Sequence, residues 1–303
     1  MTATDGHATA GNHPVDHPAD VHSAPARAEA PGLQGRTLLI SGGSRGIGLA
    51  IALRAARDGA NIALLAKTSH PHPRLEGTVH TAAREIEAAG GRALPIVGDV
   101  RYEDDVAGAV AAAMEAFGGI DVVVNNASAI DLSGTDAVEM KRYDLMADIN
   151  VRGTFMLSKF ALPALRRASN PHILTLSPPL NLDPQWAGRH LAYTMAKYGM
   201  SLTTLGLAEE LRSEGIGVNS LWPQTLIDTA AVRAMDGGQR LAQSARTPQI
   251  VADAAHAVLL RDARSCTGNF FTDEDVLRQE GITDFAPYSP GVPVDRLIPD
   301  IFL

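Results

Sequence analysis

The sequence predicts a single α/β domain built on a doubly wound parallel sheet. Three observations lead to this fold class: short apolar runs recur from Arg36 onward, most are separated by stretches of helical periodicity, and a glycine-rich turn follows the first run. Apolar strands that alternate with helices are typical of a parallel sheet covered on both faces. Right-handed crossovers then wind the chain into a sheet of the Rossmann type.

The predicted strands are short runs rich in Leu, Ile and Val, as buried parallel strands usually are. In chain order they are expected at 37–41, 61–66, 93–98, 121–125, 172–177, 217–222 and 269–273. Between them, apolar residues at helical spacing predict helices. These are expected at 48–58, 81–89, 103–117 and 192–213. Residues 35–273 therefore form the predicted domain.

The two ends of the chain have a different character. Residues 1–34 are rich in Ala, Pro, Asp and His, which predicts a disordered tail. Its histidines (His7, His13, His17 and His22) could alternatively be interpreted as metal ligands, but we predict no metal site. Residues 274–303 hold four prolines and little periodicity, so we expect an extension that packs on the domain or on a neighbouring subunit.

Composition excludes several classes of function. The 303 residues carry a net charge of −8 without any Lys/Arg run, so nucleic acid and anionic membrane surfaces are poor partners. No apolar run reaches the length of about 18 residues that a membrane span needs. A single cysteine and the lack of a recognisable targeting segment lead us to expect a cytoplasmic protein.

A glycine-rich turn, SGGSRGIG, directly follows the first predicted strand, with Gly42, Gly46 and Gly48 in the spacing G-x-x-x-G-x-G. A side chain at these positions would block either the sharp turn into the helix or the approach of a pyrophosphate to the helix N-terminus. Strand, glycines and helix in this order predict a dinucleotide site.

Charge at the end of the second strand indicates which dinucleotide is bound. NAD sites usually place an acidic residue there to bind the ribose hydroxyls. This strand instead ends in Ala66 and Lys67, and Arg45 lies inside the glycine turn. Two cations without a carboxylate favour the 2′-phosphate of NADP(H). NAD(H) is the alternative if both cations are only solvated surface charges.

Tyr193 and Lys197 are spaced one helical turn apart in a segment of helical composition, so they share a face. An ammonium beside a phenol favours the phenolate and lowers the phenol pKa, which would let Tyr193 act as a general acid or base. The pattern alone is common by chance, but after a glycine turn and a parallel-sheet pattern it predicts a catalytic pair.

These motifs, together with Asp99, NNAS at 125–128 and Asn150 in DINVRG, resemble the short-chain dehydrogenase/reductase family in order and spacing over about Gly35 to Asp273. Segments such as SPPLNLDPQW and TGNFFTDEDVL are similar to the hydroxysteroid dehydrogenase-like 2 subgroup. Animal members of that subgroup often carry a sterol-carrier domain, which the printed sequence does not contain. Lipid carriage is therefore not transferred from the resemblance to this chain. The resemblance does imply a homodimer or homotetramer.

The resemblance also implies roles for single residues. Asn150 would hold the water of a proton relay, and Lys197 would bind the nicotinamide ribose. Asn125 would line the cofactor groove and stabilise the sheet. Cofactor contacts are implied for Gly42, Ser44, Arg45, Gly46, Ile47, Gly48, Lys67, Asp99, Val100, Asn126, Ala127, Tyr193, Lys197, Pro223 and Thr229. Two departures are Ser41 in place of the family's threonine and Gln224 in place of a glycine after Pro223.

The serine of the family's catalytic set is the third departure. Leu180 stands at its usual distance before Tyr193, and alignment of the strand ends puts Pro178 in its place, directly after Ser177. We assign Ser177 to orient the substrate oxygen, which requires the chain to bulge there. A site of Asn150, Tyr193 and Lys197 without a serine is the alternative.

Together these features predict an NADP(H)-dependent oxidoreductase that exchanges a hydride with a carbonyl or secondary alcohol. Apolar residues in 178–189 and 226–246 suggest a lipid-like, terpenoid or steroid-like substrate. The alternative is a dinucleotide-binding regulatory or scaffold protein with little catalysis, which the altered serine and Pro223–Gln224 keep open. Reduction of an enoyl thioester is disfavoured, because the resemblance associates it with a longer tyrosine–lysine spacing.

Overall fold

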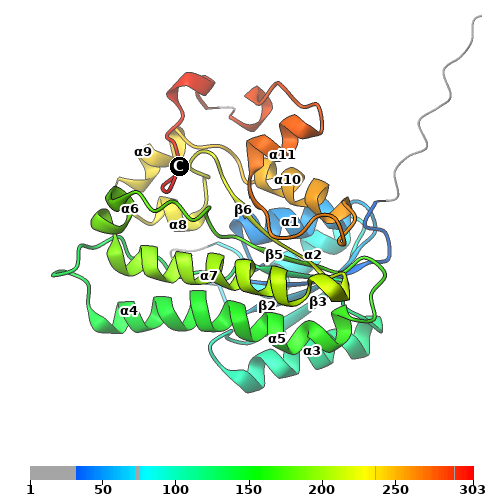
Figure 1. The fold of residues 1–303 in the computed structure, drawn as a ribbon. Coiled ribbons are helices and arrows are strands. Elements are labelled where there is room, and N and C mark those ends of the chain that lie inside the picture. The colour runs from blue at the N-terminus through cyan, green and yellow to red at the C-terminus, as the bar shows by residue number, and fades with distance from the viewer. Residues whose placement is uncertain (1–31, 72–75, 236, 290) are drawn as a thin grey trace, which may run out of the picture. The chain divides into compact units, whose positions relative to one another are not determined.

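Seven parallel strands form one sheet in the order β3–β2–β1–β4–β5–β6–β7 (Figure 1). The computed structural model describes residues 32–71, 76–235, 237–289 and 291–303. The predicted tail, up to residue 31 and with all four of its histidines, lies outside the described residues. The order changes direction beside β1, as expected for a doubly wound sheet, so the predicted fold class is confirmed.

The strands agree with the predicted ones to within two residues at each end. They are β1 Thr37–Ser41, β2 Asn61–Ala66, β3 Arg92–Val97, β4 Val122–Asn125, β5 His172–Thr175, β6 Gly217–Trp222 and β7 Phe270–Thr272. All but β3 and β7 are wholly buried. Strand β3 lies at the edge of the sheet, with no further strand beyond it in the described part of the chain. Pro95 is tolerated there because its missing N–H costs no hydrogen bond between strands.

The helices are α1 Gly46–Ala56, α2 Val79–Ala88, α3 Glu103–Phe117, α4 Met140–Met146, α5 Thr154–Leu165, α6 Pro184–Arg189, α7 Leu191–Glu210, α8 Ala230–Arg233, α9 Gly238–Gln243, α10 Gln249–Leu260 and α11 Asp273–Gln279. Local sequence fixes several ends. Thr78 and Thr81 cap α2 reciprocally, and Gly118, with φ 79°, ends α3. A π-helical turn, Ala147–Gly153, joins α4 to α5.

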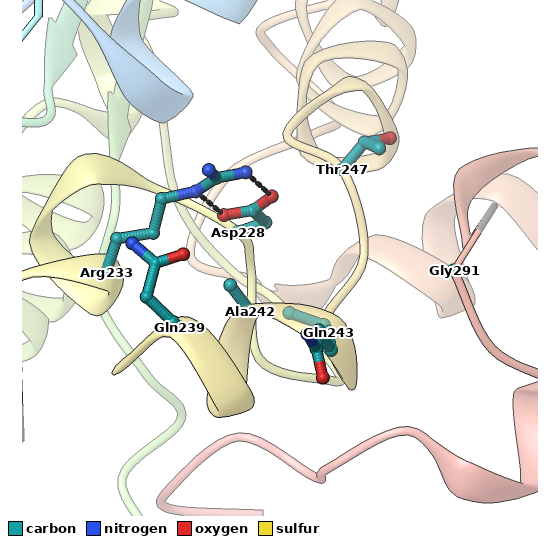
Figure 2. Close-up of a pocket in the computed structure, with 8 residues that line it drawn as sticks. Asp228, Arg233, Gln239, Ala242, Gln243, Thr247 and Gly291 are labelled. Carbon is teal, nitrogen blue, oxygen red and sulfur yellow. Dashed lines mark hydrogen bonds and ion pairs between the residues drawn. The ribbon is translucent and has the colours of Figure 1, made fainter. Parts of the chain in front are cut away.

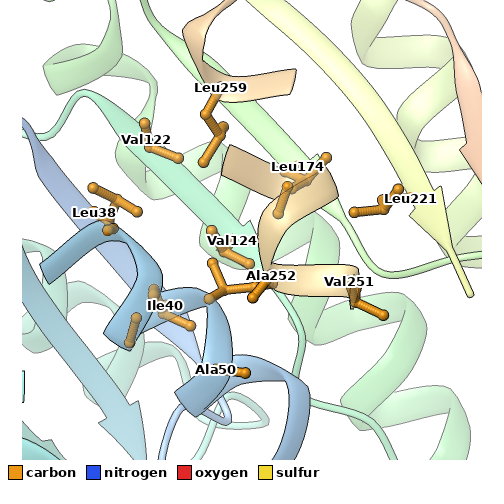
Figure 3. Packing of buried hydrophobic residues seen from close by; sticks show 14 of the residues in the cluster. Leu38, Ile40, Ala50, Val122, Val124, Leu174, Leu221, Val251, Ala252 and Leu259 are labelled. Carbon is orange, nitrogen blue, oxygen red and sulfur yellow. The ribbon is translucent and has the colours of Figure 1, made fainter. Parts of the chain in front are cut away.

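Two apolar layers bury the sheet. On one face, α1, α2 and α10 pack on the strands; Figure 3 shows Leu38, Val124 and Leu174 of the sheet against Ala252 and Leu259 of α10. On the other face, α3, α5 and the end of α7 form a second cluster with Leu39, Val123 and Ile173. This double coverage explains why the strands read as continuous apolar runs.

Candidate active site

The glycine turn between β1 and α1 allows its backbone to pack closely on the end of β4. Gly42 has φ 69° and Gly46 has φ 58°, values that favour glycine. A Cβ on Gly42 would lie 2.9 Å from Ala127 Cα, and one on Gly48 would lie 2.5 Å from Asn126 Nδ2. The turn therefore fits a dinucleotide pyrophosphate, which needs bare backbone at the N-terminus of α1.

Polar side chains hold this turn against β4. The Ser41 hydroxyl accepts hydrogen bonds from the backbone N–H groups of Asn126 and Ala127, both at 3.1 Å. The Asn126 amide donates to the Ser41 and Gly42 carbonyls, both at 3.0 Å. Asn125 is buried and donates to Ser158 Oγ at 2.9 Å, so it ties β4 to α5. Serine thus supplies the hydroxyl that the family's threonine would provide.

A cavity of about 460 Å³ opens at this end of the sheet. It is lined by eleven of the residues predicted to bind the cofactor: Gly42, Ser44, Arg45, Gly46, Ile47, Lys67, Asp99, Val100, Asn126, Ala127 and Thr229. The other four predicted residues, Gly48, Pro223, Tyr193 and Lys197, do not line it. The structure thus brings most of the predicted cofactor residues together around one ligand-sized space.

Both predicted cations line this cavity. Arg45 donates to the backbone carbonyls of Glu76 at 2.8 Å and Gly77 at 2.6 Å, which fixes its guanidinium at the cavity wall. Lys67 is exposed at the end of β2. Burial would raise the pKa of Asp99, but hydrogen bonds from Arg101 and the charge of Lys67 lower it below its ordinary value. The cavity therefore carries these two cationic side chains on its wall, of the kind that can bind a phosphate.

Thr229 and Asn150 support the cavity from two further elements. Thr229 caps α8 by accepting from Val232 N at 3.3 Å, and a Cβ on Gly46 would lie 3.5 Å from its methyl carbon. Asn150 lies in the π-helical turn, a feature that often marks functional sites. Its amide accepts from Ala129 N at 2.8 Å and donates to Ala129 O at 3.0 Å. Both Asn150 amide atoms thus hold the loop after β4.

Tyr193 and Lys197 lie one turn apart on α7 and are nearly buried, with exposures of 5% and 3%. The Lys197 ammonium donates to Leu176 O at 2.8 Å and lies 5.1 Å from the centre of the Trp222 ring. Burial lowers the pKa of Lys197 to about 7. Burial and the nearby Asp300 raise the pKa of Tyr193 above its ordinary value, opposite to the expected lowering, because loss of hydration dominates.

Ser177 is fully buried at the end of β5. Its hydroxyl hydrogen bonds with Ser220 Oγ of β6 at 2.8 Å, and Ser220 Oγ in turn donates to Thr204 Oγ1 of α7 at 2.9 Å. Among the described residues it makes no hydrogen bond with Tyr193. Its N–H donates to Thr175 O at 2.9 Å, so the chain turns tightly at Leu176, directly after β5, and this turn leaves the Ser177 hydroxyl bonded to Ser220.

Replacing Ser177 with alanine is expected to lower stability more than turnover. The change leaves the buried Ser220 hydroxyl with one partner fewer, which costs about 1 kcal/mol of unfolding free energy. Denaturant unfolding and NADPH oxidation of the same preparations measure both quantities. Thr204→Val, which breaks the other end of the same hydroxyl chain, is the matched comparison. A fall in turnover of roughly 100-fold, the size expected when a catalytic group is lost, would show instead that Ser177 takes part in catalysis.

A segment that no sequence pattern assigned to the site lies against Tyr193. The ring of Phe302 is 2% exposed and stacks on Tyr193 with centroids 6.2 Å apart. The Trp222 indole donates to Ile301 O at 3.0 Å, and Leu226 N donates to Ile298 O at 2.8 Å. In Figure 1 the chain end lies near α6 and α8. A single aromatic residue in a proline-rich tail gives no periodic signal, so the sequence could not place it.

Two aspartates, the buried Asp273 and the half-buried Asp300, flank the loop after β6. Asp273 accepts from Gln224 N at 2.8 Å, and Asp300 N donates to Gln224 O at 3.2 Å. Burial raises the pKa of both Asp273 and Asp300 to about 7. Asp273 also feels the charges of Arg246 and Glu274, and Asp300 those of Asp273 and Lys197. The Pro223–Gln224 loop is therefore held from both sides by residues of the C-terminal part of the chain. Local sequence patterns could not predict these contacts, because the residues are far apart in the sequence.

A second cavity, of about 300 Å³, is lined by Asp228, the neighbour of Thr229, and by residues of α8 and α9. Figure 2 shows the bidentate pair of Arg233 and Asp228, with contacts of 2.6 and 2.5 Å, at its wall. Neither the predicted catalytic residues nor the predicted cofactor residues line it. The pair fixes the start of α8 and thereby the position of Thr229.

Two other findings concern the described residues as a whole. Residues 32–71, 76–235, 237–289 and 291–303 contain no cluster of three or more His, Cys, Asp or Glu side chains able to hold a metal ion. Within the same ranges, none of the helices has the length and apolar character needed to cross a membrane.

Comparison with known proteins gives consistent results. Residues 36–239 match the model of the short chain dehydrogenase family. Hydroxysteroid dehydrogenase-like protein 2 of Danio rerio is 55% identical over 273 residues, which are 89% of this chain but 64% of that protein. The chain thus spans less than two thirds of this curated relative.

Solved structures are similar as well. A short chain dehydrogenase from Mycobacterium thermoresistibile is 54% identical with a TM-score of 0.85, covering 89% of this chain and 96% of that one. A metagenomic short-chain oxidoreductase in complex with NADP is 26% identical with a TM-score of 0.65, covering 79% and 97% of the two chains.

Proposed function

Because the chain belongs to the short chain dehydrogenase family, we propose that it is an NADP(H)-dependent oxidoreductase acting on a carbonyl or secondary alcohol. One observation carries the proposal: α7 holds Tyr193 and Lys197 at the same edge of the sheet as the glycine turn and its cavity. In parallel α/β sheets, ligands bind outside the carboxyl ends of the strands, where all these groups lie.

The proposed chemistry assigns the proton steps to α7. When bound, the nicotinamide ring supplies or accepts a hydride. Tyr193 is protonated at neutral pH, since the ordinary pKa of a phenol is about 10 and burial raises it further, so its hydroxyl can give a proton to the carbonyl oxygen during reduction. In the reverse direction, the phenolate accepts the proton of the alcohol. Lys197, one turn away, favours the phenolate that forms after transfer when its amine is protonated.

The experiment that tests this function is NADPH consumption against a chemically diverse panel of aldehydes, ketones and acyl thioesters. Oxidation with at least one ketone or aldehyde is the expected result. Binding of NADPH without oxidation of any panel member would instead favour the second candidate below. The proposed substrate is apolar, since the half-buried Leu180 and Leu226 lie in the two segments beside α7 and β6.

Preference for NADPH over NADH is a separate part of the proposal. It is supported by Arg45 and Lys67 at the cavity wall and by the NADP complex of the metagenomic relative. We expect Lys67→Ala to raise KM for NADPH about tenfold, the equivalent of about 1.4 kcal/mol, and to leave KM for NADH nearly unchanged. Lys159→Ala, which removes an exposed cation from α5, is the control. A wild-type preference for NADH would contradict the assignment.

A dinucleotide-binding protein with a regulatory role and little catalysis is the second candidate. Two observations favour it: the Ser177 hydroxyl is committed to Ser220, and Phe302 covers Tyr193. The proposed cytoplasmic location rests on the single cysteine, and the proposed homo-oligomeric state rests on the family resemblance. Size-exclusion chromatography with light scattering would measure the oligomeric state.

A further inference from the structure

Four aromatic rings surround Phe302, and we call them the aromatic box. Their centroids lie 5.3 Å (Tyr198), 6.0 Å (Trp186 and Trp222) and 6.2 Å (Tyr193) from that of Phe302. The box comes from α6, α7 and β6, so it lies on three elements that also position Tyr193 and the end of the sheet. It is a preformed site for one ring.

The aromatic box blocks the approach to Tyr193 while Phe302 fills it. If the proposed function is right, a substrate oxygen must contact the Tyr193 hydroxyl. Tyr193 is 5% exposed, and neither it nor Lys197 lines the 460 Å³ cavity. A substrate that reaches this hydroxyl therefore requires one wall of the site to move.

The C-terminal segment 298–302 is the wall that can move most easily. Helix α7 and strand β6 are anchored in the large buried clusters of the sheet. The segment is held by a smaller cluster around Phe302, by a few hydrogen bonds and by an isolated bridge between Thr225 and Pro299. Release of the segment breaks the bonds from Ile298 N to Ser244 O (3.0 Å) and from Asp300 N to Gln224 O (3.2 Å).

The seated segment is also locally strained. Among the described residues, Phe302 is the one non-glycine residue with positive φ, at 77°. Asp300 is half-buried and feels the like charge of the Asp273 carboxyl, which the charge of Lys197 offsets in part. The Trp186 indole N–H and the Thr225 hydroxyl are buried beside the segment without a partner in the described chain. Each of these groups regains water or freedom when the segment leaves.

We propose that the aromatic box is the substrate's apolar subsite and that segment 298–302 is a displaceable plug. The ligand class is a ketone or secondary alcohol that carries one phenyl- or cyclohexyl-sized ring. Its ring takes the place of Phe302, and its oxygen then lies beside Tyr193. The inference rests on the proposed function for the identity of the ligand, but release of the segment can be measured without turnover.

Hydrogen–deuterium exchange of the whole chain, read on the C-terminal peptide, tests the plug. With NADP present, 4-tert-butylcyclohexanol is the ring-bearing probe and 2-propanol is the matched alcohol without a ring. We expect the ring alcohol to speed exchange of the Ile298 and Asp300 amides at least fivefold, and 2-propanol to leave it unchanged. Emission of the two tryptophans of the chain, which both contact Phe302, reports binding of the probe independently.

In the Phe302→Ala variant, the Ile298 and Asp300 amides should exchange hydrogen for deuterium rapidly without any alcohol. The substitution should also lower KM for 4-tert-butylcyclohexanone at least fivefold. Phe302→Leu should give an intermediate result. Phe285→Ala is the matched control, because it removes a buried phenyl ring, 5% exposed, from the main core outside the aromatic box. It should leave exchange at Ile298 and Asp300 unchanged.

Slower exchange on addition of the ring alcohol would overturn the proposal, since the segment would then be a fixed wall that the ligand seals. Absence of any exchange or emission response up to the solubility limit would also overturn it. If the ring alcohol speeds exchange but no carbonyl is reduced, the plug stands and the proposed catalytic function fails. If carbonyls are reduced while exchange stays unchanged, the function stands and the plug fails.

Discussion

Replacement of Tyr193 by phenylalanine should reduce turnover by roughly 100- to 10,000-fold, the usual contribution of a positioned general acid. The ring and its packing against Phe302 are kept, so the fold and the aromatic box should be unaffected. The cofactor cavity does not include Tyr193, so NADPH binding should change by less than about tenfold, or about 1.4 kcal/mol. Steady-state NADPH oxidation and fluorescence titration with NADPH measure the two effects separately.

Tyr288→Phe is the matched control for this substitution. It also removes a phenol hydroxyl, one that donates to Asp253 at 2.8 Å, but from a place outside the candidate site. It should lower stability by about 1 kcal/mol and leave turnover unchanged. Undiminished turnover of the Tyr193 variant would show that another group donates the proton, and the proposed mechanism would then be wrong.

Gly42→Ala should disrupt both the fold and dinucleotide binding. The new Cβ would meet the Ala127 backbone at 2.9 Å, and φ of 69° is unfavourable for alanine. Left-handed strain of about 1–2 kcal/mol and steric overlap of about 1–3 kcal/mol together predict a loss of unfolding free energy of about 2–5 kcal/mol. Displacement of the turn should weaken NADPH binding by at least about tenfold.

Gly118→Ala separates the two contributions. Gly118 also has positive φ, 79°, but a Cβ there meets nothing within 4 Å. This variant should lose only the strain, about 1–2 kcal/mol, and bind NADPH normally. Denaturant unfolding and NADPH titration compare both variants. If Gly42→Ala binds NADPH as well as Gly118→Ala does, the turn is not the pyrophosphate site.

The local sequence pattern predicted the helices, the strands and the glycine turn well, because each of them depends on a short stretch of the chain. The bounds of β1 and α3 are those expected, and the glycine turn has the backbone that its spacing predicted. Helical spacing also placed Tyr193 and Lys197 on one face of α7. Whether these two side chains act in catalysis is still a prediction.

The surroundings of the predicted catalytic side chains were harder to predict from sequence spacing. Lowering of the Tyr193 pKa requires the attraction of the Lys197 ammonium to outweigh the burial of the phenol. Loss of hydration dominates instead, and the ammonium contacts Leu176 O and the Trp222 ring. Ser177 was assigned from its place at the end of a strand. Its actual partner, Ser220, lies 43 residues further along the chain, a distance that no local pattern spans.

The sequence by itself determined the parallel sheet, the dinucleotide turn and the positions of Tyr193 and Lys197, because strand and helix periodicity and glycine spacing act within a few residues. Only the tertiary structure decided which groups surround that pair. It turned Ser177 inward, and it brought Asp300 and Phe302 from the C-terminal segment onto Tyr193. The Ser177–Ser220 contact joins residues 43 positions apart, and the Tyr193–Phe302 contact joins residues more than 100 positions apart. Both are fixed by packing, which leaves no periodic trace in the sequence.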